Sequence, residues 1–322
     1  MTDTLRGALE LLSGGNLVSG AHIGEALGVS RSAVWKQLQR LQEWGVPIEK
    51  IRGRGYRLVG GMELLSRQRI LGQLSVDTRL LLGNLVLLEE VDSTNTVARR
   101  QIEQGLVHSY VCMAERQTQG RGRLGRTWIS PFGRNLYMSA TWEFSGGVAA
   151  LEGLSLAVGV AVSRAVQSLG VEVISLKWPN DILLNGRKVG GVLLEMLGDP
   201  SGLCQVVVGI GINVAMPRDV AIDQPWADLG SYPGVTRNAL AGAVLGELLP
   251  LLATYAETRF RSYRQAWEEL DAYGGERVRL STPGADVEGV ARGVSDTGAI
   301  CLDIDGSQRF YSGGEISLRK AL

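Results

Sequence analysis

The alternation of apolar and polar positions divides the chain into three parts, of which the first spans residues 1–62. Apolar residues recur there at helical spacing on both sides of a turn around Gly28, and Ser30 can cap the helix that follows. Residues 46–51 and 56–59 then alternate as the two strands of a hairpin. Two helices joined by a short turn and followed by a hairpin predict a winged helix-turn-helix domain.

Residues 63–273 form the second part, and their pattern predicts an α/β domain. Short apolar or alternating runs predict strands at residues 85–88, 110–114, 135–142, 173–178, 182–184, 189–194 and 205–211. Longer periodic runs predict helices at residues 94–104, 149–169 and from 236 to about 270. The last of these contains Pro250, where we expect a break or kink. Asn185-Gly186 is a strong hairpin signal, and hairpins outnumber crossovers, so a mixed, mostly antiparallel sheet with helices on one side is expected.

Residues 274–322 form the third part. Glycine and aspartate turns separate short β runs at residues 277–280, 287–294, 300–304 and 307–311. About 50 residues of this kind predict a small β-barrel. The predicted fold class is therefore α+β with three domains, at residues 1–62, 63–273 and 274–322.

The composition limits the kinds of site that the chain can contain and indicates its cellular compartment. Lys plus Arg and Asp plus Glu each number 33, so any basic patch has to be local. The three cysteines lie far apart in apolar runs, which favours buried thiols in a reducing cytoplasm over disulfides. With only two histidines, neither near a carboxylate or cysteine cluster, we expect no zinc site, no haem and no Ser-His-Asp triad. The N-terminus lacks a signal pattern, and the most apolar window, residues 148–162, is shorter than the roughly 20 residues of a membrane span, so we expect a cytoplasmic protein with no membrane partner.

The polar face of the second helix and the tip of the hairpin carry residue types that contact phosphates and base edges in DNA. The candidate DNA-binding residues are Ser30, Arg31, Ser32, Lys36, Gln37, Arg40, Arg52 and Arg54. The alternative is a winged helix that binds only protein. DNA binding is favoured because most basic residues of this part lie on the second helix and the wing.

Glycines and arginines alternate in the stretch GRGRLGRTW, from Gly120 to Trp128. Its first six residues fit the dinucleotide-binding pattern G-x-G-x-x-G, but the following Trp-Ile-Ser-Pro-Phe-Gly run cannot begin a helix. We therefore expect no NAD. Arg121, Arg123 and Arg126 on this glycine-rich loop still require an anionic partner.

Four further polar clusters stand where loops meet strands, at residues 92–95, 115–119, 177–181 and 186–188. Each has a simpler explanation: a helix cap at Asp92-Ser93-Thr94, a surface side chain at Gln117, and a turn held by Pro179. Their occurrence together with the arginine loop favours a common site.

In this order after a winged helix, several motifs closely resemble those of bifunctional biotin protein ligases that also repress the biotin operon. They are Ser93-Thr94-Asn95, GRGRLGRTW, SPFGRNLYMS from Ser130, KWPND from Lys177, GRKVGG from Gly186, GIGIN from Gly209 and GGEISLR from Gly313. The resemblance spans nearly the whole chain, and lipoate ligases share the central fold but lack the GRGRLGR and KWPND runs. It implies a class II synthetase-like biotin/lipoate ligase fold in the centre and an SH3-like barrel at the C-terminus.

The resemblance also implies an activity, that of a biotin–[biotin carboxyl-carrier protein] ligase. Biotin and ATP, with Mg²⁺, would give biotinoyl-5'-AMP, and a lysine of the biotin carboxyl carrier protein of acetyl-CoA carboxylase would accept the biotinoyl group. A ligand-dependent homodimer would bind operator DNA of biotin synthesis genes. Two alternatives stay open: a biotin-sensing repressor without catalysis, and a ligase whose winged helix does not repress transcription.

By resemblance, the residues divide into four sets. The catalytic set is Lys188, Arg123 and Asp181, and Asp181 is also the candidate Mg²⁺ ligand. The biotin-binding set is Ser93, Thr94, Asn95, Gln117, Gly120, Arg121, Gly122, Arg123 and Lys188. The nucleotide-binding set is Arg121, Arg126, Trp128, Lys177, Asn180, Asn213 and Trp226. Leu124 departs from the family, whose members commonly carry a basic residue there, and residues 216–226 match the family's adenine-covering loop only at Met216 and Trp226.

Overall fold

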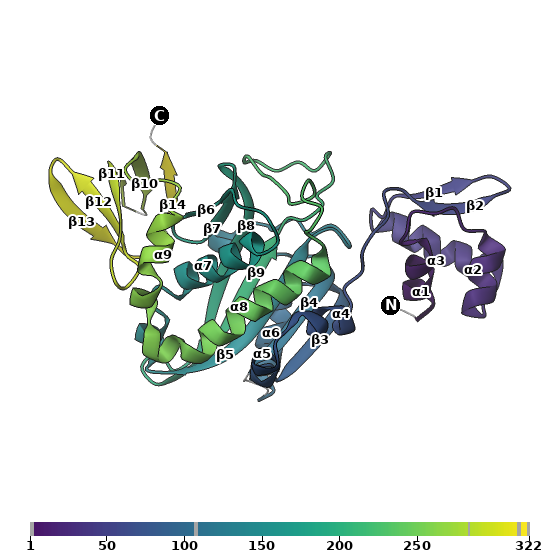
Figure 1. Ribbon diagram of the computed structural model, residues 1–322, viewed down its shortest axis with the longest axis horizontal. Coiled ribbons are helices and arrows are strands. Elements are labelled where there is room, and N and C mark those ends of the chain that lie inside the picture. The colour runs from purple at the N-terminus through teal and green to yellow at the C-terminus, as the bar shows by residue number, and fades with distance from the viewer. Residues whose placement is uncertain (1–2, 106–108, 283, 314–316, 321–322) are drawn as a thin grey trace.

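The first domain is a winged helix-turn-helix, which confirms the prediction (Figure 1). The computed structural model describes residues 3–105, 109–282, 284–313 and 317–320. The elements of this domain are α1 (Asp3–Leu12), α2 (Gly20–Leu27), α3 (Arg31–Glu43), β1 (Ile48–Ile51) and β2 (Gly55–Leu58). Gly28 ends α2 with a φ of 64°, a conformation that favours glycine. The Ser30 side chain caps α3 by accepting from the Ala33 amide, as its position in the sequence predicts.

A seven-stranded sheet forms the centre of the molecule. Its strands are β3 (Asn84–Val91), β4 (Tyr110–Gln117), β5 (Leu136–Ser145), β6 (Ile174–Lys177), β7 (Asp181–Leu184), β8 (Arg187–Gly198) and β9 (Leu203–Ile212). Their order in the sheet is β3-β4-β5-β9-β8-β7-β6. The pair β3–β4 is parallel and the other neighbouring pairs are antiparallel. The prediction of a mixed, mostly antiparallel sheet is thereby confirmed.

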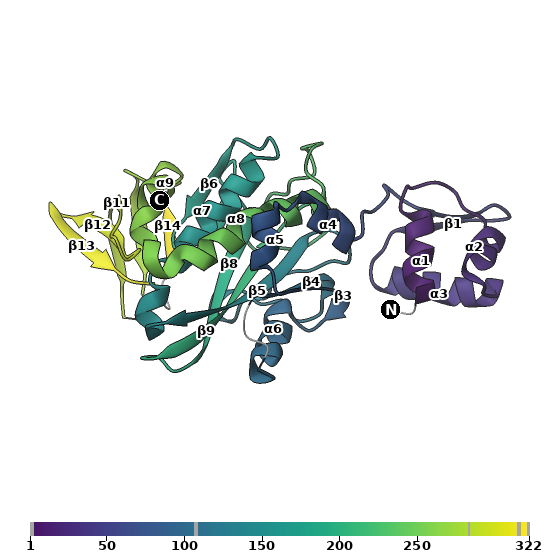
Figure 2. The same cartoon turned by 60° about the horizontal axis from the view of Figure 1, so that its bottom comes forward.

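Helices cover both faces of this sheet, so the expectation of helices on one side is wrong (Figure 2). One face carries α4 (Arg67–Gln73), α5 (Val76–Leu81), α7 (Leu154–Gln167) and α8 (Arg237–Thr258). The other face carries α6 (Thr94–Glu103), whose Ala98 packs against Cys112 and Val207. The cause lies in β4, where both alternating sets of side chains are apolar and buried.

Helix α8 continues through Pro250 and ends at Thr258, so the helix break predicted at Pro250 occurs instead at Arg259, whose φ is 51°. A short 3₁₀ turn η3 (Phe260–Ser262) and α9 (Arg264–Glu269) follow. The helical stretches Gly147–Gln167, which begins with η2 (Gly147–Leu151), and Arg237–Thr258 are long and apolar enough to cross a membrane. Both lie mostly inside the protein core, in keeping with the prediction of a core helix in the most apolar window.

The C-terminal domain is a five-stranded antiparallel sheet. Its strands are β10 (Arg277–Ser281), β11 (Asp286–Val294), β12 (Ile300–Ile304), β13 (Ser307–Tyr311) and β14 (Ser317–Lys320). The last strand returns to pair with the first, in the order β13-β12-β11-β10-β14, as a small barrel requires. The apolar side chains of this domain join the core of the central domain, whereas the winged helix has a core of its own. Residues 314–316 of the GGEISLR motif lie outside the described part of the chain.

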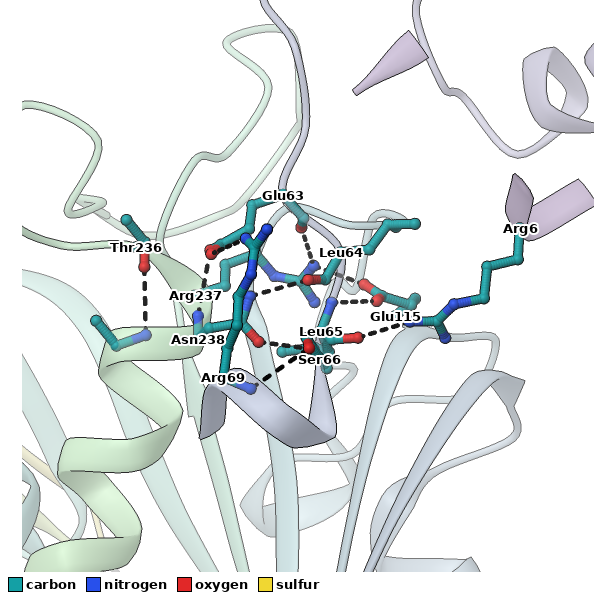
Figure 3. Close-up of polar contacts among 11 residues, drawn as sticks. Arg6, Glu63, Leu64, Leu65, Ser66, Arg69, Glu115, Thr236, Arg237 and Asn238 are labelled. Carbon is teal, nitrogen blue, oxygen red and sulfur yellow. Dashed lines mark hydrogen bonds and ion pairs between the residues drawn. The ribbon is translucent and has the colours of Figure 1, made fainter. Parts of the chain in front are cut away.

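The winged helix contacts the central domain through Trp44 and is joined to it by a segment held in place. The ring of Trp44, at the end of α3, stacks on that of Phe132 with centroids 5.2 Å apart. The segment of residues 63–66, which we call the linker, is held by hydrogen bonds with Arg237 and Asn238 at the start of α8 (Figure 3). The connection between the domains is therefore fixed to the central sheet by specific side chains.

Candidate active site

A cavity of about 450 Å³ lies beside the central sheet, lined by the turns that follow β4, β6 and β7. Most of the predicted site residues line it: Ser93, Thr94, Asn95, Gln117, Arg121, Gly122, Arg123, Arg126, Trp128, Lys177, Asn180, Asp181 and Lys188. Gly120, Asn213 and Trp226 are not among the lining residues. The four polar clusters and the arginine loop thus do meet at one place.

One end of the cavity is an uncharged network of amides and hydroxyls. The backbone N and the hydroxyl of Thr94 both donate to Gln117 Oε1, at 2.9 and 3.2 Å. Ser139 donates to Asn95 Oδ1 at 2.6 Å and lies 2.8 Å from the Thr94 hydroxyl. Ser93 makes no capping hydrogen bond with its side chain, so the explanation of this cluster as a helix cap is insufficient. A ligand with amide-like donors and acceptors fits this end of the cavity.

The glycines of the GIGIN motif leave space for two of these side chains. A Cβ atom on Gly209 would lie 2.2 Å from Asn95 Oδ1, and one on Gly211 would lie 2.7 Å from Trp128 Cε2. Neither residue has a positive φ, so the requirement for glycine comes from close approach alone. Strand β9 therefore has no side chain at the two positions where Asn95 of α6 and Trp128 of the arginine loop pack against it.

The arginine loop closes on itself over the cavity. Trp128 N donates to Gly120 O at 2.8 Å, and Gly122 N donates to Arg126 O at 2.7 Å. Between them, η1 (Arg123–Gly125) contains Leu124 with a φ of 57° and an exposed side chain. The loop is thus a compact turn that presents its arginines to the cavity.

Each of two arginines also contacts another element. Arg121 forms an ion pair with Glu195 at 3.4 Å, and Arg123 donates to Asn180 Oδ1 at 3.2 Å. Burial lowers the pKa of Arg123, although Asp181 opposes this effect. A bound anion could take the place of Glu195 or Asn180 as the partner of these guanidinium groups, or could bind beside them.

The other end of the cavity carries a buried charge cluster. Asp181 Oδ1 lies 2.6 Å from Lys188 Nζ, and Asp181 Oδ2 lies 3.2 Å from Lys177 Nζ. Burial would raise the pKa of the Asp181 carboxyl, but the two lysines outweigh it and hold the pKa below its usual value. One carboxylate shared by two ammonium groups leaves a net positive charge, which suits an anionic substrate.

Lys188 and Trp128 face each other across this end. The Lys188 ammonium lies 5.7 Å from the centre of the Trp128 ring. Trp128 Nε1 is buried with no hydrogen-bond partner among the described residues. Because a buried donor is costly without a partner, this nitrogen marks a place where a ligand acceptor is expected.

Asn213 and Trp226 lie just behind the cavity. Asn213 Nδ2 donates to Ala227 O at 3.1 Å, and the backbone on both sides of Trp226 pairs with Lys188 through Pro225 O and Ala227 N. Their contact with a nucleotide stays a prediction.

The sequence analysis did not assign two residues of this site, Ser139 and Glu195. Asn95 Nδ2 donates to Glu195 Oε2 at 3.0 Å, so Glu195 contacts both the amide end and Arg121. A signal was present, because each is a polar residue between two apolar neighbours in its strand. The cavity is also lined by Tyr273 and Arg319, which bring the C-terminal domain to the site.

The candidate DNA-binding residues lie mainly on the exposed side of α3 and on the wing. Gln37 is half-buried and the others are exposed. The Arg40 guanidinium lies over the ring of Trp44, 5.0 Å from its centre, beside a groove that is also lined by residues 87–90. Arg40 is thus turned toward the central domain, and its role in DNA binding stays a prediction.

Three parts of the chain match family models. Residues 87–213 match the biotin/lipoate A/B protein ligase family, residues 5–57 an HTH domain, and residues 273–319 the biotin protein ligase C-terminal domain. The bifunctional ligase/repressor BirA of Escherichia coli is 38% identical over 316 residues, which cover 97% of this chain and 96% of that protein. The biotin–[acetyl-CoA-carboxylase] ligase of Paracoccus denitrificans is 35% identical over 234 residues, which cover 67% of this chain and 92% of the relative.

Solved structures agree with these matches. The biotin protein ligase from Aquifex aeolicus in complex with biotin and ATP superposes with a TM-score of 0.64 at 33% identity, covering 74% of this chain and 100% of that chain. The chain therefore belongs to the biotin protein ligase family, and within it to the bifunctional ligase/repressor proteins.

Proposed function

We propose that the chain is an ATP-dependent biotin protein ligase that also represses biotin synthesis genes. The observation that carries the proposal is one cavity with an uncharged amide end and a cationic end. Biotin combines an amide-like ureido ring with a carboxylate, and ATP supplies phosphates. The two ends match these two kinds of group.

In the first step, an oxygen of the biotin carboxylate attacks the α-phosphorus of ATP. A new O–P bond forms, the bond from this phosphorus to the α,β-bridging oxygen breaks, and pyrophosphate leaves with that oxygen. Negative charge spreads over the phosphate oxygens during this step, so positioning and cationic groups provide most of the rate. Lys188 and Arg123 are the cations we assign to this charge. Ser93, Thr94, Asn95 and Gln117 hold the ureido ring at the amide end.

In the second step, the ε-amine of a lysine on the biotin carboxyl carrier protein of acetyl-CoA carboxylase attacks the carbonyl of biotinoyl-5'-AMP. An amide bond forms, AMP leaves with the C–O–P oxygen, and the amine releases a proton. Closure of the arginine loop over the mixed anhydride keeps water from this carbonyl until the carrier arrives.

We infer that Mg²⁺ enters with the ATP phosphates and not as a resident ion. Both oxygens of Asp181 already contact lysines, and no cluster of three His, Cys, Asp or Glu side chains occurs in the described ranges. A role for Asp181 as a magnesium ligand would require one lysine to move away. The residues as arranged do not form a magnesium site by themselves.

The regulatory half of the proposal is that a ligand-dependent homodimer binds operator DNA in the cytoplasm. The exposed basic residues of α3 and the wing support it. The buried, unpaired thiols of Cys112, Cys204 and Cys301 agree with a reducing compartment.

The test is to incubate the purified chain with biotin and ATP, measure pyrophosphate release and take a mass spectrum of the bound ligand. Bound biotinoyl-5'-AMP together with released pyrophosphate is expected. Bound biotin without pyrophosphate would instead indicate a biotin-sensing repressor without catalysis. Adenylation without binding to any biotin-synthesis promoter would leave a ligase whose winged helix does not repress.

A further inference from the structure

Arg237, at the start of α8, is a deeply buried charged residue near the linker, at 3% exposure. It forms an ion pair with Glu115 at 2.6 Å, and both side chains are only 4% exposed (Figure 3). Replacing a buried ion pair with apolar side chains is often neutral or stabilising, so fold stability alone is a weak explanation for it. Arg237 lies outside the cavity and has no part in the reaction described above.

The guanidinium of Arg237 holds three acceptors from separate parts of the chain. Nη1 donates to Glu63 O of the linker at 2.8 Å and contacts Glu115 Oε2 of β4. Nε donates to Asn135 O at 2.9 Å. The acceptors are met by two different nitrogens of the planar guanidinium, whereas a lysine ammonium has only one nitrogen.

Asn135 in turn holds the loop that follows the GIGIN strand. Its side chain is fully buried, at 0% exposure. Oδ1 accepts from Val214 N at 3.0 Å, and Nδ2 lies 2.8 Å from Met216 Sδ and 3.5 Å from Asn213 Oδ1. The segment 213–216 carries the two residues, Asn213 and Met216, that are expected on the nucleotide side.

We propose that Asn135 and Arg237 are positioning residues for the nucleotide: Arg237 fixes the backbone of Asn135, and the Asn135 side chain fixes Asn213 and Met216. This inference rests on the proposed ligase function. The amide end of the cavity has its own supports, Ser139 and Glu195, which do not depend on this pair. Substitutions that break the contacts of Arg237 or Asn135 should therefore raise KM for ATP and leave KM for biotin unchanged.

Asn238 offers a matched control on the same turn of α8. It accepts from Ser66 N at 2.7 Å, donates to Leu64 O at 2.9 Å, and its backbone N donates to Glu63 Oε2. These bonds hold the linker as Arg237 does, but they do not lead to Asn135. A variant of Asn238 therefore loosens the linker without touching the nucleotide loop.

The experiment compares Arg237→Lys, Asn135→Ser and Asn238→Ala by pyrophosphate release, with ATP varied at saturating biotin and biotin varied at saturating ATP. Because a lost buried hydrogen bond costs about 1.4 kcal/mol, we expect KM for ATP to rise about tenfold in the first two variants. KM for biotin should stay within about twofold of the parent in those two variants, and both constants within about twofold in Asn238→Ala.

Three outcomes would overturn the proposal: an unchanged KM for ATP, an equal rise in both constants, or the same selective rise in Asn238→Ala. Asn135→Ser keeps the backbone acceptor of Arg237, so it tests the loop contact even if Arg237→Lys does not fold. Absence of pyrophosphate release from the parent chain would be a failure of the proposed function, and the two failures are thus distinguishable.

Discussion

At the scale of single residues, the site is a balance of charges around Asp181. Lys188 and Lys177 share this carboxylate, so each ammonium is only partly neutralised and stays available to a substrate anion. The sequence places these residues in one candidate group, because KWPND and GRKVGG each have a charged residue beside a turn, and the structure brings them together in the cavity. It does not predict that they pair with one another, because that depends on the registers of β7 with β6 and with β8.

The first prediction concerns Lys188. Replacing it with alanine removes one preorganised cation from the developing phosphate charge, which typically costs about 10² to 10³ in rate. Lys188→Ala should fold normally and release pyrophosphate at that reduced rate. The neighbouring exposed Arg187→Ala is the control and should match the parent. Adenylation by Lys188→Ala within about threefold of the parent would remove Lys188 from the catalytic set.

A second residue-scale prediction concerns Arg123, whose contact with Asn180 joins the arginine loop to the turn between β6 and β7. Without its side chain, the loop loses this contact and the cation that we assign to the mixed anhydride. Arg123→Gly should therefore weaken biotinoyl-5'-AMP binding more than biotin binding, as measured by calorimetry with each ligand. Equal losses for the two ligands would show that Arg123 only shapes the cavity.

At the scale of elements, strand β9 is the surface on which the site is assembled. Glycines alternate with Ile210 and Ile212 along this strand. The isoleucines pack into the core on one face, and the glycines on the other face contact Asn95 and Trp128. The alternation of glycine and isoleucine in this strand is visible in the sequence, but the reason why these positions require glycine is not. That reason depends on α6 and the arginine loop, which are distant in sequence.

This arrangement leads to a prediction for Gly211. A methyl group there would lie 2.7 Å from Trp128 Cε2, so the indole has to move from its present place near Lys188. Gly211→Ala should raise KM for ATP about tenfold or more, since the displaced ring loses its place beside the phosphate site. Gly246→Ala on α8 is a matched control, because nothing lies within 4 Å of its new methyl group. Similar kinetics for both variants would contradict the prediction.

How far the sequence predicts the structure differs between elements. The winged helix and the pairing of the hairpin strands follow from periodicity and turn residues, whereas the meeting of the motifs is expected from their joint occurrence and from the family resemblance. The second helical face of the sheet does not, because an apolar strand such as β4 looks the same whether one or both faces are covered. The Arg237–Asn135 contact spans 102 positions: Asn135 lies in the SPFGRNLYMS motif, but that motif does not indicate its partner, and no local pattern marks Arg237.

At the scale of the whole molecule, a single winged helix has too few cations for tight DNA binding. Phosphate contacts alone give roughly micromolar or weaker affinity at physiological salt, so repression needs two copies on a two-fold site. We expect that biotinoyl-5'-AMP promotes this pairing. Footprinting on a biotin-synthesis promoter should show protection with biotin plus ATP and much less without them. Equal protection in both conditions would separate DNA binding from the ligand.

The separate core of the winged helix has a genetic consequence. Substitutions that empty this small core should deregulate biotin synthesis while cells keep the biotinylated carrier that they need to make fatty acids. Substitutions in the large core, which the central and C-terminal domains share, should be lethal unless a second ligase is supplied. Phe132 is the exception, because its ring belongs to the small core although it lies in the chain between the arginine loop and Asn135. A substitution of Phe132 should therefore both abolish repression of the biotin synthesis genes and slow growth.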